Sequence, residues 1–338
     1  MISDSRMRRL IDVIDRPDFG DTKYRILSEI GRGGMGTIYL AQDTQLSRQV
    51  AIKVLNVSEM NAQMIERMEQ EAGIIARLEH PGIIPVHDVG RLPDGRVFYV
   101  MKYVRGKRLD HHVDGSMTLT EHLRLFRTAC EAVAFAHSHG VIHRDLKPEN
   151  IMIGPFGEVL IMDWGIAKVL GEQDADCSPA TQEFSPQATA VVTAHGTVLG
   201  TPSYMSPEQS LGEVDLVDRR ADVYSLGAIL YFLLLGHSPP SSGEALSFSR
   251  LPGRSFKVPR RLAAICMKAM ASSREGRYLD AAALSEEINC YLEGDQIVAY
   301  TENLVERGVR WVDRHRFIVY LVLAYILMRV ILILATNR

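Results

Sequence analysis

Apolar and polar residues alternate in short runs along the first hundred residues, a pattern that predicts β-strands. Glycine, proline and aspartate fill the gaps between the runs and indicate tight turns. Strands are predicted at residues 24–30, 37–41, 49–55, 83–89 and 96–103. Between the third and fourth strands, residues 60–79 carry apolar side chains at helical spacing, and His80-Pro81-Gly82 ends this helix. The pattern therefore predicts a sheet accompanied by one helix.

Beyond residue 104 the spacing of apolar residues changes to that of amphipathic helices. Thr118 and Glu121 have the spacing of a capping box, and the apolar stripe after them predicts a helix that ends at His139-Gly140. Residues 171–196 are rich in serine, threonine, alanine and proline without a sustained period, and they predict a long loop. Further helices are predicted at residues 218–236, 258–271 and 278–293, with stops at Gly236 and Gly294.

The composition is that of a globular chain with reduced cysteines. Its 338 residues suit two lobes, and 46% hydrophobic with 23% charged residues excludes a disordered or fibrous protein. Lys and Arg number 38 against 41 Asp and Glu, so no overall basic field exists to hold nucleic acid. The four scattered cysteines form no CxxC pair, which favours free thiols in a cytosol. Charges throughout residues 1–20 leave no apolar stretch for a signal peptide.

Four short motifs carry the chemistry of the chain. Gly31, Gly33 and Gly36 lie between two predicted strands, where a backbone without side chains can approach phosphates, although such a hairpin is as often a flexible turn. Val50-Ala51-Ile52-Lys53 ends a strand with an ammonium group, which taken singly is the pattern of an edge lysine in water. The other two motifs are His143-Arg144-Asp145-Leu146-Lys147-Pro148-Glu149-Asn150 and Asp163-Trp164-Gly165.

In this order the motifs resemble the signature set of protein kinases, and they look like the bacterial branch of eukaryotic-like Ser/Thr kinases. The match covers about residues 24–292. The resemblance implies an α+β bilobal kinase fold, with a β-rich N-lobe at 24–104 and a helical C-lobe at 105–293. It also implies a long activation segment at 163–208 and leaves residues 1–23 as a leader.

The resemblance further implies ATP as phosphate donor and Mg²⁺ as cofactor, with Mn²⁺ as an alternative metal. The glycine-rich loop is expected over the phosphates, and Lys53 is expected to hold the α- and β-phosphates while Glu71 orients it. Adenine is expected beside the gatekeeper Met101. The other residues expected around adenine are Ile38, Ala51 and Tyr103.

Catalysis is expected in the segment from Asp145 to Asp163. By resemblance Asp145 accepts the proton of the substrate hydroxyl, and Lys147 marks the Ser/Thr form of the catalytic loop. Asn150 and Asp163 are expected to supply hard oxygen ligands to magnesium. Three positions depart from the usual pattern. Trp164 replaces the phenylalanine of Asp-Phe-Gly, and Ser206 replaces the alanine of Ala-Pro-Glu. Lys102 stands in the hinge, where related kinases often have an acid.

Regulation is expected within the activation segment. Thr193 and Thr197 are the expected phosphorylation sites, because Arg144 could pair with a phosphothreonine and order the loop. Thr201 and Glu208 belong to a stretch that resembles the substrate-docking loop and favours polypeptide acceptors. By the same resemblance, Asp222 and Arg277 are expected to be buried anchors of the catalytic loop and of Glu208.

Residues 317–335 predict a single transmembrane helix. Nineteen residues at about 1.5 Å each span roughly 28 Å, near the ~30 Å apolar core of a bilayer, and Arg329 is their one charge. The basic linker at 294–316 predicts a kinase on the cytoplasmic side of the cell inner membrane, with the C-terminus outside and no outer sensor domain. Its arginines, against one beyond the span, are Arg307, Arg310, Arg314 and Arg316.

Three functions compete at this point. The leading hypothesis is a membrane-tethered Ser/Thr protein kinase that also phosphorylates itself in signalling, with ATP, protein substrates, membrane lipid and a second copy of the chain as expected partners. A pseudokinase scaffold, which binds nucleotide without transfer, is the rival from another class. A small-molecule kinase of similar fold is the third.

Overall fold

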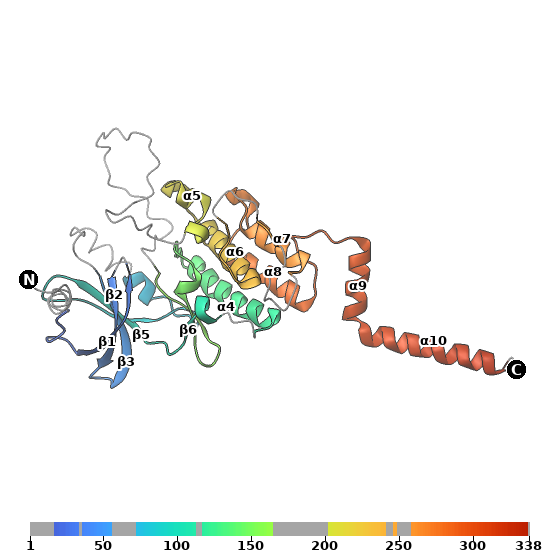
Figure 1. Cartoon of the computed structure of the whole chain (residues 1–338), viewed down its shortest axis with the longest axis horizontal. Coiled ribbons are helices and arrows are strands. Elements are labelled where there is room, and N and C mark those ends of the chain that lie inside the picture. The colour runs from blue at the N-terminus through green and yellow to red at the C-terminus, as the bar shows by residue number, and fades with distance from the viewer. Residues whose placement is uncertain are drawn as a thin grey trace, which may run out of the picture.

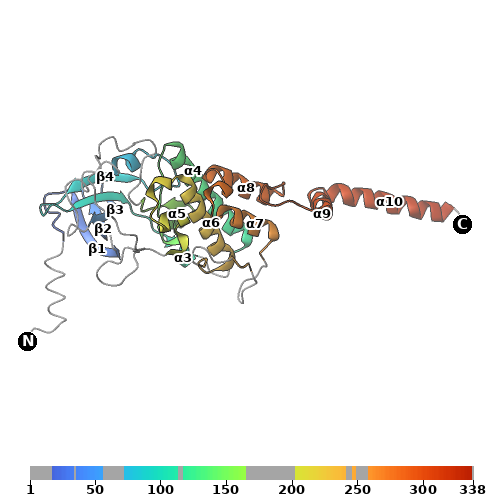
Figure 2. The same ribbon diagram turned by 90° about the horizontal axis from the view of Figure 1, so that it is seen from above.

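A computed structural model describes residues 17–33, 36–55, 72–112, 117–164, 202–240, 246–248 and 258–336. These residues form a sheet lobe and a helical lobe, joined by the segment after the last strand of the sheet (Figure 1). The predicted bilobal α+β arrangement is therefore confirmed. In both views the last two helices extend away from the helical lobe (Figure 2).

The sheet lobe is built on five antiparallel strands in the order β1-β2-β3-β5-β4. All five predicted strands are present, and their bounds differ most at the end of the first strand and at the start of the fourth. The first strand runs on through the glycine-rich stretch, and the fourth begins at Val86 because Ile83 instead bridges to Ile161 of the other lobe. The strands are β1 Tyr24–Gly33, β2 Gly36–Asp43, β3 Arg48–Leu55, β4 Val86–Arg91 and β5 Val97–Lys102.

The predicted helix at 60–79 is described only in its final part. Residues 72–76 are helical, and residues 56–71 lie outside the described part of the chain. Ala72, Ile75 and Leu78 are buried, as the helical spacing of apolar residues predicts.

The helical lobe begins with α4 Leu119–Ser138, whose capping box at Thr118 and Glu121 is present as predicted. The most buried helix is α6 Arg219–Leu235, and it ends at Gly236 with a left-handed φ of 83° that glycine adopts without strain. The remaining helices are α3 Leu109–His112, α5 Pro207–Ser210, α7 Arg260–Ala269 and α8 Ala281–Glu293, with short 3₁₀ turns η1 Pro148–Asn150, η2 Pro202–Tyr204, η3 Val214–Leu216 and η4 Arg274–Gly276.

A second, small sheet lies between the lobes and carries the catalytic motifs at its ends. Its order is β6-β7-β8, and the sequence pattern did not predict it because its strands are only two or three residues long. The strands are β6 Lys107–Arg108, β7 Ile151–Ile153 and β8 Val159–Ile161.

The chain continues past α8 through a segment that packs on the helical lobe and then through α9 Leu304–Arg314 and α10 Arg316–Thr336. Many large apolar side chains of α10 are exposed, among them Phe317, Leu321 and Leu332. Among the described residues, no helix combines the length and the apolar character that crossing a membrane requires.

Candidate active site

The glycine-rich hairpin is the first component of the site. Gly33 pairs with Gly36 across the turn, so the loop is the tip of the β1–β2 hairpin. A Cβ on Gly36 would lie 2.2 Å from the Val54 carbonyl oxygen, so this glycine is needed for the packing of β2 on β3. A Cβ on Gly33 would meet nothing within 4 Å, and one on Gly31 would make only ordinary contacts with Ile38. Packing therefore explains Gly36, whereas the open space at Gly33 fits the predicted approach of a ligand.

An apolar cluster between the lobes brings the predicted adenine residues together. Ala51 and Met101 are buried in it, and Ile38 and Tyr103 pack against them. These four side chains come from β2, β3, β5 and the segment after β5. The far side of the cluster comes from the small sheet and the residue after it, through Leu160, Met152 and Met162. The flat faces of the adenine ring suit apolar side chains of this kind.

Lys53 and Asp163 join the two lobes within the site. The Lys53 ammonium donates to Asp163 Oδ1 at 2.5 Å, and the Tyr99 hydroxyl donates to the same oxygen at 3.4 Å. Both donors stand on neighbouring strands, because Lys53 of β3 pairs with Tyr99 of β5. Burial, and then the nearby Asp163 charge, hold the pKa of Tyr99 well above its ordinary value, so its hydroxyl keeps its proton and donates.

The catalytic loop brings two of the predicted residues, Lys147 and Asn150, against the carboxylate of a third, Asp145. Lys147 Nζ donates to Asp145 Oδ2 at 2.8 Å, and the Asn150 amide nitrogen donates to the Asp145 carbonyl at 2.7 Å and to Oδ2 at 3.2 Å. The Asp145 side chain remains 45% exposed. Within the described part of the chain, Asp145 Oδ1 makes no hydrogen bond, so this oxygen is left to accept a proton.

Asp222 fixes the backbone beneath that carboxylate. Its two oxygens accept the backbone N–H groups of His143 and Arg144 at 2.8 Å each, and His137 Nε2 lies 2.9 Å away. Burial alone would raise the pKa of Asp222, but the hydrogen bonds from His137 and the backbone lower it below its ordinary value. Arg144 adopts a left-handed φ of 67°, and these bonds hold it there. The predicted anchor role of Asp222 is thereby seen in the structure.

His143 is fully buried and links the catalytic loop to Trp164. Its Nδ1 accepts the Asp145 N–H at 3.3 Å, which leaves the proton on Nε2 to be donated to the Met162 carbonyl at 3.1 Å. Burial lowers the pKa of His143, in agreement with this neutral ring. The His143 and Trp164 rings lie 4.7 Å apart, and the Trp164 indole N–H has no hydrogen-bond partner among the described residues.

The oxygens available here suit magnesium. The Asn150 amide nitrogen donates to Asp145, and no described residue hydrogen-bonds to its amide oxygen, which can therefore bind a cation; Asp163 adds a carboxylate. No cluster of three or more His, Cys, Asp or Glu side chains with metal-binding geometry occurs in the described ranges. Magnesium usually takes only one or two protein carboxylates, with waters and substrate phosphates completing its shell. A set of one carboxylate and one amide oxygen therefore fits a metal held jointly with ATP.

The docking-loop side of the site is anchored by a buried ion pair. Arg277 donates to the two oxygens of Glu208 at 2.6 and 2.8 Å, as the sequence predicts. Gln209, next in the chain, donates to the Arg144 carbonyl at 2.8 Å and so ties α5 to the catalytic loop. Four predicted site residues lie outside the described part of the chain: Glu71, Thr193, Thr197 and Thr201.

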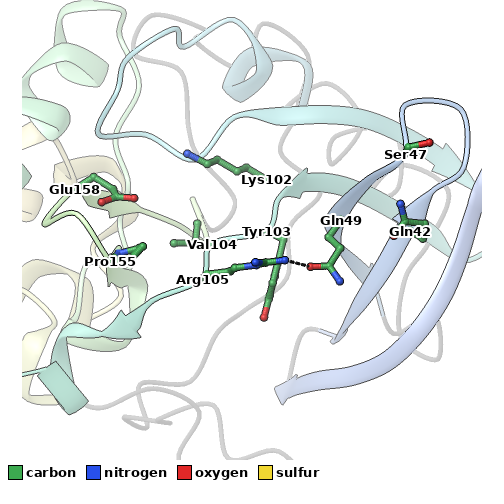
Figure 3. Close-up of a pocket in the computed structure, with 9 residues that line it drawn as sticks. All are labelled: Gln42, Ser47, Gln49, Lys102, Tyr103, Val104, Arg105, Pro155 and Glu158. Atoms are coloured by element: carbon green, nitrogen blue, oxygen red, sulfur yellow. Dashed lines mark hydrogen bonds between the residues drawn. The ribbon is translucent and has the colours of Figure 1, made fainter.

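A separate pocket of about 530 Å³ borders the hinge (Figure 3). Among the predicted ATP-binding residues only Tyr103 lines it, and most of its other walls are polar. Arg105 crosses it to donate to Gln49 at 2.8 Å. Lys102, the unusual hinge residue, projects along this pocket and is exposed, so its side chain is not part of the apolar adenine cluster.

The sequence reasoning missed Tyr99 and Gln209 as members of the site. Tyr99 could have been found, since alternation along β5 places it on the same side as Met101. Gln209 follows the docking motif directly, but no pattern indicated that its side chain would reach the Arg144 carbonyl.

Comparison with known proteins places this geometry in context. The family model described as "Protein kinase domain" matches residues 24–274. Serine/threonine-protein kinase PknD of Protochlamydia amoebophila is 36% identical over 299 residues, which cover 80% of this chain and 30% of that protein. Serine/threonine-protein kinase PknB of Mycolicibacterium smegmatis is 36% identical over 294 residues, which cover 82% and 44%. The chain thus spans less than half the length of these relatives.

A solved structure gives the same picture. The crystal structure of the Mycobacterium tuberculosis PknI kinase domain superposes with a TM-score of 0.58 at 26% sequence identity. The alignment covers 79% of this chain and 95% of that chain. The part of the chain outside the alignment is therefore additional to the PknI kinase domain.

Proposed function

The chain belongs to the protein kinase domain family, and we propose that it transfers the γ-phosphate of ATP to serine and threonine hydroxyls of proteins. One observation carries the proposal. Lys147 and Asn150 both donate to the Asp145 carboxylate, while Lys53 reaches Asp163 from the other lobe. A scaffold that only bound nucleotide would not need this arrangement around Asp145, so the pseudokinase alternative is not favoured.

Each residue has a task that its contacts allow. Asp145 Oδ2 accepts hydrogen bonds from Lys147 and Asn150, so Oδ1 is the oxygen that accepts the proton of the attacking hydroxyl. Lys147 places a positive charge beside this carboxylate, where it can also neutralise the phosphoryl group in transfer. When bound, magnesium would neutralise the β- and γ-phosphates, and Asn150 and Asp163 are the residues that would hold it.

The activity is tested with the purified chain, ATP, magnesium and a generic Ser/Thr substrate. Asp145→Asn should reduce the rate by orders of magnitude, because the amide cannot accept the proton. Asp94→Asn, the same substitution in the exposed β4–β5 turn, is the matched control and should leave the rate unchanged. Nucleotide binding without any transfer by the unsubstituted chain would establish the pseudokinase instead.

Autophosphorylation is part of the proposal, at Thr193 or Thr197. Arg144 supports it from the described residues, since its backbone is held by Asp222 and Gln209 beside the catalytic carboxylate. Mass spectrometry of active protein should find phosphate on one of these threonines, and Ala substitution of both should lower activity. An unmodified pair, or full activity of the double substitution, would refute this part.

Although no described helix meets the requirements of a membrane span, we also propose that α10 tethers the kinase to the cell inner membrane, with the lobes in the cytoplasm and the C-terminus on the other side. The exposed apolar side chains of α10 support this, because water is a poor solvent for such a surface. The one charged residue within 317–335 has a local partner: Arg329 Nε donates to the Tyr325 hydroxyl at 3.1 Å. The arginines before the helix favour the cytoplasmic side.

Membrane fractionation tests the tether. The full chain should sediment with membranes and stay there in carbonate or in 1 M salt, where charge attraction is screened to a Debye length of roughly 3 Å. Release by salt would indicate peripheral binding through the arginines. Protection of the lobes from protease added on the cytoplasmic side would contradict the orientation.

A further inference from the structure

The Tyr99 hydroxyl is a polar group that no step of the proposed reaction uses. The Tyr99 side chain packs against the apolar cluster and shares its face of β5 with the apolar residues Val97 and Met101. A hydroxyl that is partly removed from water costs free energy unless it finds a hydrogen-bond partner. Its partner here is Asp163, the predicted metal ligand.

The contacts around Asp163 distinguish its two carboxylate oxygens. Tyr99 and Lys53 both donate to Oδ1, so the N-lobe holds one oxygen of the carboxylate from two adjacent strands. The described residues give Oδ2 no hydrogen bond. Asp163 also adopts a left-handed φ of 52°, a backbone conformation that needs support from its surroundings.

Lys53 alone is a poor support for that carboxylate. An ammonium on a flexible stem is a point charge that imposes little orientation, and Lys53 is also the residue expected to hold the ATP phosphates. A tyrosine hydroxyl stands on a rigid ring with few rotamers, and the Lys53 ammonium lies 5.9 Å from the centre of that ring. The ring therefore contacts both partners and can hold Asp163 Oδ1 while Lys53 serves the nucleotide.

We propose that Tyr99 is a positioning residue that holds Asp163 Oδ1, so that Oδ2 faces the metal bound with ATP. This role rests on the proposed function, since it concerns the same metal ligand. Tyr99 touches neither substrate nor metal in this role and acts only through Asp163.

Nucleotide binding tests the proposal without phosphoryl transfer. The dissociation constant of a fluorescent ADP analogue is measured on the full chain, with and without magnesium. In Tyr99→Phe the tightening caused by magnesium should shrink about three- to tenfold, the range expected for one hydrogen bond, while binding without magnesium stays unchanged. The magnesium concentration for half-maximal phosphorylation should rise by a similar factor.

Tyr24→Phe is the matched control, because it removes a tyrosine hydroxyl that donates to Asp88 at 2.7 Å in the same lobe, away from the site. It should leave the magnesium effect as it is. Tyr99→Leu separates the ring from the hydroxyl: a loss as large as that of Tyr99→Phe assigns the effect to the hydroxyl. A normal Tyr99→Phe with a defective Tyr99→Leu would make Tyr99 a packing residue and overturn the proposal.

The possible failures are distinguishable. A magnesium effect that is equal in wild type and Tyr99→Phe overturns the role of Tyr99 alone. An unsubstituted chain that binds nucleotide with magnesium but transfers no phosphate overturns the proposed function and leaves the positioning role supported by the binding data. A wild-type chain whose nucleotide affinity ignores magnesium overturns both the metal site and the role of Tyr99.

Discussion

Glu208 and Arg277 form a buried, two-point ion pair between the start of α5 and the turn before α8. The Arg277 side chain is fully buried, and Glu208 is 6% exposed. Burial would raise the pKa of Glu208, but the hydrogen bonds from Arg277 lower it below its ordinary value. Arg277 also donates to the carbonyls of Ala271, Ser272 and Arg220, so one guanidinium gathers three segments of the helical lobe.

Arg277→Met is therefore expected to lower the free energy of unfolding by about 3–5 kcal/mol, because Glu208 is left as an unpaired buried charge. Arg277→Lys should recover little of the lost unfolding free energy, because a lysine ammonium cannot replace the planar guanidinium that donates to both Glu208 oxygens. Adding Glu208→Leu to Arg277→Met should restore part of the loss. Urea denaturation measures all three, and a loss below about 1 kcal/mol for Arg277→Met would contradict this account.

Long periodic elements could be predicted from the sequence, and short or cross-chain features could not. Helix α6 begins at the Asp218 cap and ends at Gly236, as its caps and apolar run predict. The strands β6, β7 and β8 were not predicted because two or three residues are too few to show an alternating apolar pattern. The packing of residues 295–302 on the helical lobe was also not predicted, because the contacts of that segment exist only once the lobe has folded.

In the candidate site, too, some residues could be predicted from the sequence and others could not. The resemblance of the motifs to the kinase signature set indicated Lys53, Asp145, Asn150 and Asp163, and the chemistry of phosphoryl transfer explains their residue types. The contact between Tyr99 and Asp163 joins residues 64 positions apart, so it depends on how the lobes meet rather than on local pattern.

Lys147 should matter for the rate more than for nucleotide binding. Its ammonium lies 2.8 Å from Oδ2 of Asp145, whose other carboxylate oxygen, Oδ1, is expected to take the proton. Lys147→Met should therefore lower kcat by about 10²-fold or more with little change in the KM for ATP. Lys268→Met, on α7 in the helical lobe, is the matched control. A changed KM with an unchanged kcat would instead make Lys147 a nucleotide-binding residue.

Stability should fall as the pH drops below about 6.5, and His143 should be one cause. Burial lowers the pKa of this ring below the ordinary 6.5, so in that range the unfolded chain binds a proton that the folded chain does not. The free energy of unfolding therefore decreases with falling pH. The acidic groups that oppose this shift, without cancelling it, are Asp222, Asp145 and Asp163.

Urea denaturation at about pH 7.5 and about pH 5.5 measures the effect. His143→Phe keeps an aromatic ring against Trp164 but cannot titrate, so its loss of stability between the two pH values should be smaller than that of the wild type. A part of the loss should persist, because burial also lowers the pKa of His80 and His87. An unchanged pH dependence in His143→Phe would show that His143 is not a source of it.

The segment after α8 should be part of the stable helical lobe rather than a free linker. Ile297 is 2% exposed within the main apolar core, and the Ala299 N–H donates to the buried Glu287 carboxylate at 2.6 Å. Glu302, with a side chain 4% exposed, lies 3.4 Å from Arg261 of α7 and 2.7 Å from Arg310 of α9. These contacts fasten α9 to the lobe through one carboxylate.

Two shortened chains and one substitution test this attachment. A chain that ends at Gly294 should lose about 2–5 kcal/mol of unfolding free energy, because it leaves the site of Ile297 empty. A chain that ends at Arg316 keeps every contact of Glu302 and should unfold as the full chain does. Glu302→Gln should cost about 1–2 kcal/mol, less than a fully buried pair, because Arg261 and Arg310 retain partial access to water. Equal unfolding free energies of the two shortened chains would show that the contacts of residues 295–302 do not stabilise the lobe. These residues would then not hold α9 in a fixed orientation.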